Sequence, residues 1–314
     1  MTGIEWTERT WNPVTGCTRV SPGCLDCFIE RQPPMRMAHR WFDGPQIGAS
    51  TGVELHPERL EHPRRWRKPQ MVFVNSMSDL FHDDVPDVFI AQVFTAMALA
   101  PRHTFQILTK RPARMRALLA DLWFLEEVQE RYAGNYDGEW TFTWPLRNVW
   151  LGVSTETQQW ANLRIPILLA TPAAVRFVSA EPLLGPIDLT TIPGTLTGID
   201  WLIVGGESGP KARPMHPNWA RALRDQCTET AAPVPFFFKQ HGEFASSRSV
   251  GDRWEWADPA AWVRESDGQI GDEQTALAGG GSWCAVWRVG KKSAGRELDG
   301  RFWDEIPEPA GVPR

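Results

Sequence analysis

The sequence predicts an α/β protein, built as a partial or full parallel (β/α) barrel with a small antiparallel C-terminal cap. Three observations predict this fold class. Short apolar, β-branched runs recur through most of the chain, and each is followed by a polar or glycine-containing turn. Amphipathic stretches of helical length separate several of these runs, which favours parallel βαβ units. From about residue 244 the pattern changes to short aromatic runs between glycine-rich turns, which is typical of antiparallel strands.

Six of the apolar runs have the composition of strands that are buried on both faces. They are residues 71–75, 105–108, 149–153, 175–178, 201–204 and 235–238, and we expect one more strand before or near the first cysteine. Helices are expected at residues 86–99, 113–130 and 217–230. Neither a GxGxxG motif after the first strand nor a P-loop is present, so a nucleotide-binding doubly wound sheet is the weaker choice.

These elements predict two domains. Residues 1–243 form the barrel, with a cysteine-containing loop at residues 16–28 and an insertion at about residues 121–147. Residues 244–314 form the β-rich cap.

Composition limits the class of protein. The chain contains no run of eighteen apolar residues, so we expect no membrane span. The N-terminus lacks the basic and apolar regions of a signal peptide, so we expect a cytoplasmic protein. Clustered cysteines in that compartment indicate metal, cluster or redox chemistry rather than disulfides. The net charge of −5 argues against a globally basic nucleic-acid binder but leaves room for a local basic channel.

Three of the five cysteines lie in the loop "GCTRVSPGCLDCF", at Cys17, Cys24 and Cys27. A structural zinc ion takes four ligands, which His39 would have to complete here. An iron–sulfur cluster held by three thiolates leaves one iron open to a small molecule. The pattern therefore predicts an iron–sulfur site, with a zinc site as the alternative. Cys227 and Cys284 are interpreted as buried small hydrophobic residues.

Polar side chains follow each predicted strand. The βα loops of a parallel barrel converge at the carboxyl ends of its strands, so we expect these side chains on one rim. Glu181 and Glu207 would need partners there, which Lys110, Arg111 or Arg213 would supply, and both structural pairing and substrate binding are open to them. The predicted rim comprises Ser76, Ser78, Asp79, Thr109, Lys110, Arg111, Ser154, Glu156, Ser179, Glu181, Glu207, Ser208, Lys239 and Gln240.

Two basic clusters stand out, "HPRRWRKP" at residues 62–69 and "TKRPARMR" at residues 109–116. One interpretation is a solvated surface with ion pairs. The other is phosphate contact with a nucleic acid or nucleotide, with Trp66 stacking on a base.

Several motifs together carry a family resemblance that covers nearly the whole chain. "EWTERTWNPVTGCTRVSPGCLDC", "LTKRP", "SAEPLLGPI", "VGGESG" and "AGRELDGRFWDEIP" resemble a phage- and prophage-associated family of unknown function marked by a three-cysteine motif. That family is usually placed near spore photoproduct lyase in the radical S-adenosylmethionine (SAM) superfamily. The resemblance implies that Cys17, Cys24 and Cys27 ligate a 4Fe-4S cluster, and that SAM on the fourth iron is cleaved to a 5′-deoxyadenosyl radical.

The resemblance also implies further cofactor-binding residues. In the superfamily, residues after the second strand hold the amino group of SAM, and here these are Ser76, Ser78 and Asp79. Residues after the fourth strand hold the ribose, and here these are Ser154 and Glu156.

The sequence departs from the superfamily pattern in three places. The first cysteine spacing is x6 instead of x3, and Asp26 stands where an aromatic residue is common. "GGES" at residues 205–208 follows a late strand, so we expect it to place Glu207 near the substrate rather than to bind SAM.

Three functional hypotheses result. The first is a radical SAM-like enzyme that repairs or modifies a nucleic acid base or a nucleotide. The second is a zinc-stabilised nucleic-acid-binding protein without catalysis. The third is a non-catalytic iron–sulfur protein that acts with a companion protein, because members of the resembled family are often encoded beside one.

Overall fold

The computed structural model describes residues 4–135, 142–246 and 257–308. The chain divides into two compact units. The first unit comprises Met1–Val153, Pro166–Phe177 and Glu308–Arg314, and the second comprises Ser154–Ile165 and Val178–Pro307. The predicted boundary at residue 244 stays a prediction. Part of the predicted insertion at 121–147, residues 136–141, lies outside the described residues.

A seven-stranded parallel sheet is the main β element, and its strand order β1-β4-β5-β6-β7-β8-β9 follows the order of the chain. A chain-ordered parallel sheet is the topology of a (β/α) barrel, whereas a doubly wound sheet reverses its order at a switch point. The predicted α/β class is therefore confirmed, and the sheet is consistent with a partial barrel. Its strands are β1 (Arg9–Trp11), β4 (Met71–Val74), β5 (Thr104–Thr109), β6 (Val149–Ser154), β7 (Val175–Ala180), β8 (Trp201–Gly205) and β9 (Phe236–Gln240).

Parallel pairing aligns the first three strands closely. Val72 and Val74 of β4 lie opposite Phe105 and Ile107 of β5, and all four side chains are buried. The β1 strand adds Trp11 opposite Val74. These apolar, mostly β-branched or aromatic residues suit strands that are covered on both faces.

The other face of the same strands is filled by aromatic rings. The Trp6 ring lies 4.7 Å from Phe73 and 6.3 Å from Phe177, measured between centroids. The side-chain amide of Gln106 donates a hydrogen bond to the Trp6 carbonyl at 3.3 Å. A Cβ atom at Gly152 would lie 2.5 Å from the Phe177 ring, so glycine is required where that ring crosses β6.

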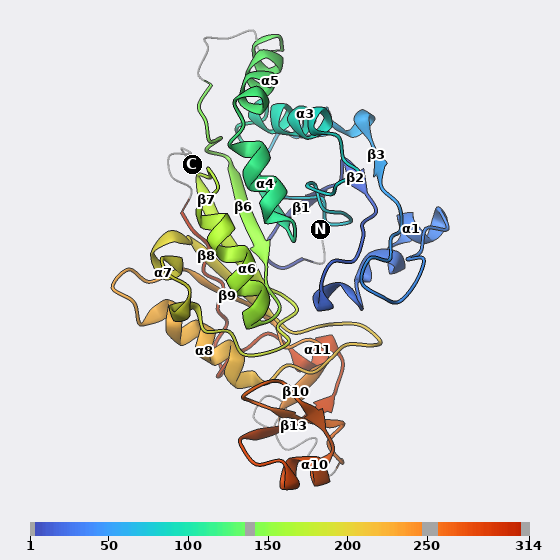
Figure 1. The fold of residues 1–314 in the computed structure, drawn as a ribbon, viewed down its shortest axis with the longest axis vertical. Helices are drawn as coiled ribbons and strands as arrows, with labels where there is room; N and C mark the ends of the chain where they lie inside the picture. Colours follow the sequence, from blue (N-terminus) through green and yellow to red (C-terminus); the bar gives the residue numbers. More distant parts are fainter. Residues whose placement is uncertain (1–3, 136–141, 247–256, 309–314) are drawn as a thin grey trace. The chain divides into compact units, whose positions relative to one another are not determined.

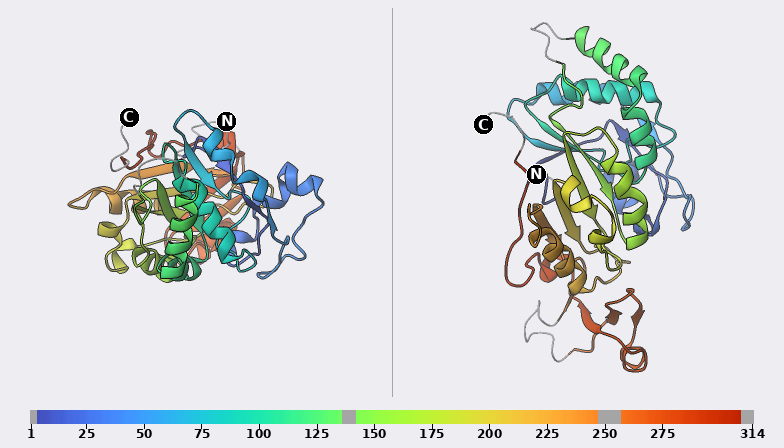
Figure 2. Two further views of the ribbon diagram at one scale, coloured as in Figure 1. Left: turned by 90° about the horizontal axis from the view of Figure 1, so that it is seen from above. Right: turned by 60° about the vertical axis from the view of Figure 1, so that its left-hand side comes forward.

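Helices of the first unit cover its strands, and α5 lies against α3 in both views of the fold (Figures 1 and 2). They are α1 (Pro33–Met37), α2 (His62–Arg65), α3 (Asp87–Ala98), α4 (Pro112–Leu119) and α5 (Leu122–Ala133), with the short 3-10 helices η1 (Pro22–Cys24), η2 (Phe28–Arg31) and η3 (Pro57–Arg59). The single helix predicted at 113–130 is wrong, because the chain breaks at Asp121. The Asp121 side chain accepts a hydrogen bond from the Trp123 N–H at 2.8 Å and so caps a new helix.

The second unit contains a separate four-stranded antiparallel sheet of order β10-β13-β11-β12, which confirms the antiparallel character predicted after residue 244. It appears in orange and red in Figure 1. Two short helices, α10 and α11, were missed by the sequence reading. The elements are β10 (Phe244–Ser246), β11 (Ala261–Arg264), β12 (Ile270–Gly271), β13 (Trp283–Arg288), α7 (Thr195–Gly198), α8 (Pro217–Thr228), α10 (Glu273–Ala278), α11 (Lys291–Ala294) and η4 (Leu189–Thr191), while α6 (Gln158–Leu169) carries residues of both units.

In the described part of the chain, no helix is long and apolar enough to cross a membrane. The cytoplasmic location stays a prediction.

Candidate functional site

The cysteine loop leaves the sheet at the carboxyl end of its first strand. After β1 the chain forms β2 (Val14–Thr15), which pairs with β3 (Glu54–Leu55), and Gly16 then pairs in parallel with Ser78. Gly16 has φ +88°, and a Cβ atom there would lie 1.8 Å from the Gly52 carbonyl oxygen. Only glycine fits this turn, so the residue before Cys17 fixes where the loop begins.

Backbone hydrogen bonds fold the loop tightly. The Cys17 N–H donates to Thr51 Oγ1 at 3.0 Å, and the Thr51 N–H donates back to the Cys17 carbonyl at 3.0 Å. The Cys24 N–H donates to the Ser21 carbonyl at 2.8 Å, and the Cys27 N–H donates to the Cys24 carbonyl at 3.3 Å. All three cysteines are free thiols and only partly exposed.

The three thiols act on one another electrostatically. The pKa of Cys17 is raised to about 12, mainly by burial and also by the charges of Asp79, Cys24 and Cys27, while the charge of Arg111 acts in the opposite direction. Burial also raises the pKa of Cys27, against a hydrogen bond from the Ile29 backbone. The charges of Lys110 and Arg19 oppose the same rise. The loop therefore gathers three sulfur atoms among three cations.

Asp79 and Arg111 form a nearly buried ion pair beside the loop, with side-chain exposures of 7% and 11%. Asp79 Oδ1 accepts from the Thr109 hydroxyl at 2.7 Å and from the Phe81 N–H at 3.0 Å. Asp79 Oδ2 accepts from the Lys110 N–H at 3.0 Å and from Arg111 Nη1 at 3.1 Å. With four donors on one carboxylate, the ends of β4 and β5 are tied together.

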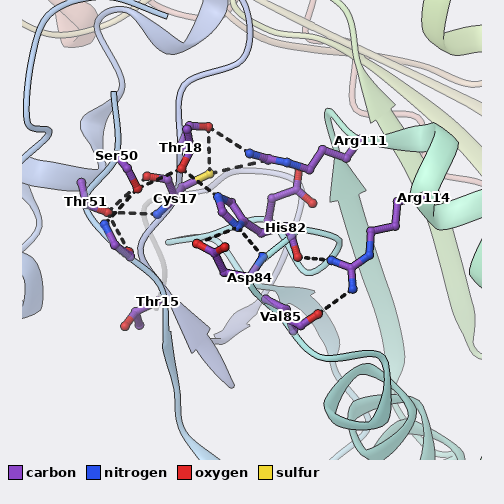
Figure 3. A network of polar contacts seen from close by, with 12 residues as sticks. Thr15, Cys17, Thr18, Ser50, Thr51, His82, Asp84, Val85, Arg111 and Arg114 are labelled. Carbon is purple, nitrogen blue, oxygen red and sulfur yellow. Dashed lines mark hydrogen bonds and ion pairs between the residues drawn. The ribbon is translucent and has the colours of Figure 1, made fainter. Parts of the chain in front are cut away.

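Arg111 extends this pair to the thiol loop. Its Nη1 lies 3.9 Å from Cys17 Sγ, and its Nη2 donates to the Thr18 carbonyl at 3.2 Å. Figure 3 shows the guanidinium group of Arg111 directed at both residues. Asp79 therefore holds the guanidinium beside Cys17, and the two charges act on that thiol in opposite directions, since Asp79 raises its pKa and Arg111 lowers it.

A second line of contacts supports the loop from the other side (Figure 3). The Asp84 N–H donates to His82 Nδ1 at 3.1 Å, so Nε2 carries the ring proton and donates to Thr18 Oγ1 at 2.8 Å. The Thr18 hydroxyl in turn donates to Ser50 Oγ at 2.8 Å. Burial lowers the pKa of His82, which keeps the ring neutral. These contacts could not be predicted from the sequence, because His82, Thr18, Ser50 and Thr51 share no motif and meet only in the fold.

Ser76 and Ser78 lie beside this loop but are engaged with the backbone around it. The Ser76 hydroxyl donates to Asn12 Oδ1 at 3.2 Å, and the Ser78 hydroxyl donates to the Val14 carbonyl at 2.9 Å. Both contacts join the end of β4 to the turn after β1. Their role in binding SAM stays a prediction.

Ser154 and Glu156, the predicted ribose ligands, belong to a buried cluster. Glu156 Oε2 accepts from Arg164 Nη1 at 2.9 Å, with side-chain exposures of 0% and 3%. The same Arg164 atom donates to the Ser154 carbonyl at 2.7 Å. The Ser154 hydroxyl donates to the Glu181 carbonyl at 3.1 Å. The Glu156 carboxylate has no exposed surface, and the role of Ser154 and Glu156 in binding the ribose of SAM stays a prediction.

The two rim glutamates of the second unit each form an ion pair. Glu181 Oε1 lies 3.0 Å from Lys239 Nζ, so none of the three partners expected for it is the right one. Glu207 pairs with Arg213 as expected, accepting from its Nε at 2.8 Å and its Nη2 at 2.6 Å. Substrate binding by Glu181 and Glu207 stays a prediction.

Within residues 4–135, 142–246 and 257–308, no group of three or more His, Cys, Asp or Glu side chains is arranged to hold a metal ion. His39 is exposed, in a left-handed backbone conformation with φ 53°. The alternative of a zinc site that His39 completes stays a prediction. The assignment of Cys17, Cys24 and Cys27 as cluster ligands stays a prediction.

The remaining two thiols differ. Cys227 of α8 is fully buried, and burial raises its pKa to about 12, which confirms its interpretation as a small hydrophobic residue. Cys284 of β13 is partly exposed, so the same interpretation is wrong there. Its strand lies in the small antiparallel sheet, where alternate side chains face solvent.

Fold and loop together define an α/β protein whose parallel sheet carries a three-thiol loop at the carboxyl end of its first strand. Over residues 1–307 the chain matches the family described as "Protein of unknown function (DUF5131)", and it belongs to that family. No curated protein and no solved structure matches the chain. The family description contains nothing about SAM chemistry or phages, so both stay predictions.

Proposed function

We propose that this protein is an iron–sulfur enzyme of the radical SAM type that acts on a nucleic acid base or a nucleotide. The observation that carries the proposal is the position of the thiol loop. It leaves the carboxyl end of the first strand of a parallel sheet and lies against the ends of the next two strands. This is the edge at which parallel barrels build their sites. The nucleic acid or nucleotide substrate is taken from the family resemblance alone.

The donor set suits a cluster better than a single ion. A structural zinc ion needs four ligands about 2.3 Å from one centre, whereas the loop supplies three cysteines. Thiolates that bind different irons of one cluster lie farther apart and need not converge. Three thiolates also bring negative charge, which Arg19, Lys110 and Arg111 offset from nearby. The neighbouring cations therefore complement the negative charge that three thiolates would bring.

The chemistry that the bound group supplies is one-electron reductive cleavage of SAM. The residues of the chain have supporting tasks. The Arg111 guanidinium, held by Asp79, lies beside Cys17, and the Ile29 backbone makes a hydrogen bond to the sulfur of Cys27. Both contacts favour thiolate over thiol, which is the form that binds iron. The hydrogen bond between His82 and Thr18 supports the thiol loop from the side opposite Arg111.

The test is reconstitution of the protein with iron and sulfide without oxygen, followed by reduction in the presence of SAM. We expect iron and sulfide at cluster stoichiometry and the formation of 5′-deoxyadenosine, measured by mass spectrometry. Cys24→Ala should lose both signals because it removes one of the three thiolates. The matched control is Cys284→Ala, which removes a partly exposed thiol outside the loop and should keep both.

Other outcomes would point elsewhere. Stoichiometric zinc in a colourless protein would reject the proposal and favour the nucleic-acid-binding alternative. A cluster that forms but never cleaves SAM, with or without nucleic acid present, would favour the iron–sulfur protein that acts with a companion.

A further inference from the structure

Exposed cations gather at the edge of the first unit's sheet where the strands begin. This edge is opposite the carboxyl edge, which carries the thiol loop. Arg65, Arg67 and Lys68 precede β4, and Arg102 precedes β5. Because β4 and β5 pair in parallel, these residues lie at the same edge, where the strands begin. We call them the amino-edge patch. All four are exposed, and within the described residues none of the four forms an ion pair, whereas their neighbour Arg64 pairs with Glu61 at 3.5 Å.

The backbone that carries the patch is held in place. His103 Nε2 lies 3.1 Å from the Pro63 carbonyl oxygen, and Arg102 Nη1 donates to the Trp66 carbonyl at 3.4 Å. The Trp66 ring packs edge-on against His103 at 5.7 Å, and the guanidinium of Arg9 covers a face of the same ring at 4.5 Å. The ring is thus engaged in supporting the patch, which argues against the base stacking that the sequence suggested for Trp66.

We propose that the amino-edge patch binds the phosphate backbone of a nucleic acid polymer. Among the described residues these four exposed cations form no ion pair, while the chain as a whole carries a net charge of −5, so any attraction of a polyanion comes from the patch and not from the net charge. Guanidinium groups bind phosphate oxygens in pairs of hydrogen bonds, and such contacts do not depend on base sequence.

An anionic membrane surface would also attract cations, but it fits this patch less well. Membrane-surface segments insert large apolar side chains between lipid headgroups. Among the described residues, the exposed large apolar side chains nearest to residues 62–69 in sequence are Ile47 and Val88. The patch therefore offers positive charge but no large apolar side chain that would insert into a membrane. This is the character of a surface that binds the phosphate backbone of a nucleic acid.

The position of the patch also bears on substrate size. The thiol loop lies at the carboxyl edge of the same strands, which are four residues long in β4 and six in β5. At about 3.3 Å per residue the two edges are roughly 13–20 Å apart. A free nucleotide is too short to contact both edges, whereas a polymer can. This step rests on the proposed function, but binding by the patch does not need a cluster.

The experiment measures binding of a fluorescent single-stranded DNA of about 30 nucleotides, and of its duplex, over about 50–200 mM salt. The variant replaces the whole patch, with Arg65→Gln, Arg67→Gln, Lys68→Gln and Arg102→Gln. We expect affinity at the lower salt to fall at least about tenfold, and the slope of log affinity against log salt to fall by roughly 3. A matched control, Arg36→Gln, Lys211→Gln, Lys292→Gln and Arg301→Gln, removes four exposed cations outside both basic clusters and should change affinity less than about threefold.

A conservative variant tests charge against structure. Arg65→Lys, Arg67→Lys and Arg102→Lys keep every charge, so the salt slope should stay near that of the unmodified protein. Equal losses in the patch and control variants would overturn the proposal, because net charge alone would then explain binding. So would an unchanged affinity in the patch variant, binding to phosphatidylserine vesicles but not to DNA, or competition by a mononucleotide as strong as that by the polymer. Because these assays need no SAM cleavage, their failure is distinguishable from failure of the proposed enzyme.

Discussion

The cationic side chains at the carboxyl edge and at the amino edge of the first unit's sheet differ in their partners and in their exposure. At the carboxyl edge, Arg111 is bound to Asp79 and to the Thr18 carbonyl. Arg40 nearby donates to Glu54 at 2.8 Å and to the Thr51 carbonyl at 3.2 Å. At the amino edge, the four cations of the amino-edge patch are exposed and form no ion pair among the described residues.

The difference follows from burial. A charge that leaves water needs partners, whereas an exposed charge is satisfied by solvent. A group fixed by several partners cannot rearrange, so the carboxyl edge suits a small ligand of one defined geometry. A group free to turn on a long side chain can follow an irregular chain of phosphates, so the amino edge suits a polyanion. Replacing residues at each edge, and comparing buried groups with exposed ones elsewhere, tests this contrast.

The largest loss of stability is expected for Asp79→Asn. The carboxylate accepts four hydrogen bonds, so an amide must turn its NH2 group toward donors and leave the guanidinium of Arg111 without a counter-charge. We expect a loss of about 3–5 kcal/mol in the free energy of unfolding, measured with urea. Asp84→Asn, at a side chain that is 67% exposed, should change it by less than about 0.5 kcal/mol. Similar losses in both variants would contradict the contrast.

The same contrast extends to the thiols outside the loop. The pKa of Cys227 is raised from 9.0 to about 12 by burial, so its thiolate fraction near pH 8 is lower by about a thousandfold. Alkylation of the folded protein should be slower by at least that factor than in the urea-unfolded protein, and should rise tenfold per pH unit. Peptide mass spectrometry of iodoacetamide-treated protein measures both. Cys284, which is partly exposed, is the internal reference, and equal labelling of the two would refute the expectation.

A smaller effect is expected at the turn that begins the thiol loop. Gly16→Ala forces a Cβ atom against the Gly52 carbonyl at 1.8 Å and keeps a left-handed backbone, so we expect about 2–3 kcal/mol of destabilisation. Gly48→Ala is the matched control, because Gly48 has a similar φ of +92° but no atom within 4 Å of the new Cβ. It should cost only about 1 kcal/mol. If urea unfolding shows the same loss for both, the contact with Gly52 is not what selects glycine.

The smallest effect on stability is expected at the amino edge. Each of Arg65→Gln, Arg67→Gln, Lys68→Gln and Arg102→Gln should change the free energy of unfolding by less than about 0.5 kcal/mol, because each side chain is exposed and forms no ion pair among the described residues. Arg102→Gln also removes the hydrogen bond to the Trp66 carbonyl, which is long at 3.4 Å. Thermal or urea unfolding of the single variants measures this. A loss above about 1 kcal/mol in any of them would show that the patch has a structural role.

Much of the fold could be predicted from the sequence because it depends on local patterns. Apolar runs such as 71–75 and 201–204 are near-continuous and β-branched or aromatic, and they became β4 and β8. The helix predicted at 217–230 became α8, which begins at Pro217. The break at Asp121 was missed, because a capping side chain competes with helix propensity only once the following turn forms.

The sequence by itself determined the apolar runs that form the strands, the three-cysteine loop and the glycine at which that loop begins. Residue type and spacing are local properties of the chain. The tertiary structure alone decided which charges meet. Asp79 and Arg111 are 32 residues apart and join only because β4 and β5 pair in parallel. Glu156 is drawn into a buried pair with Arg164, and Glu181 pairs with Lys239 rather than with any partner expected for it. Ion pairing depends on distance in space and on burial, and neither quantity exists until the strands are aligned.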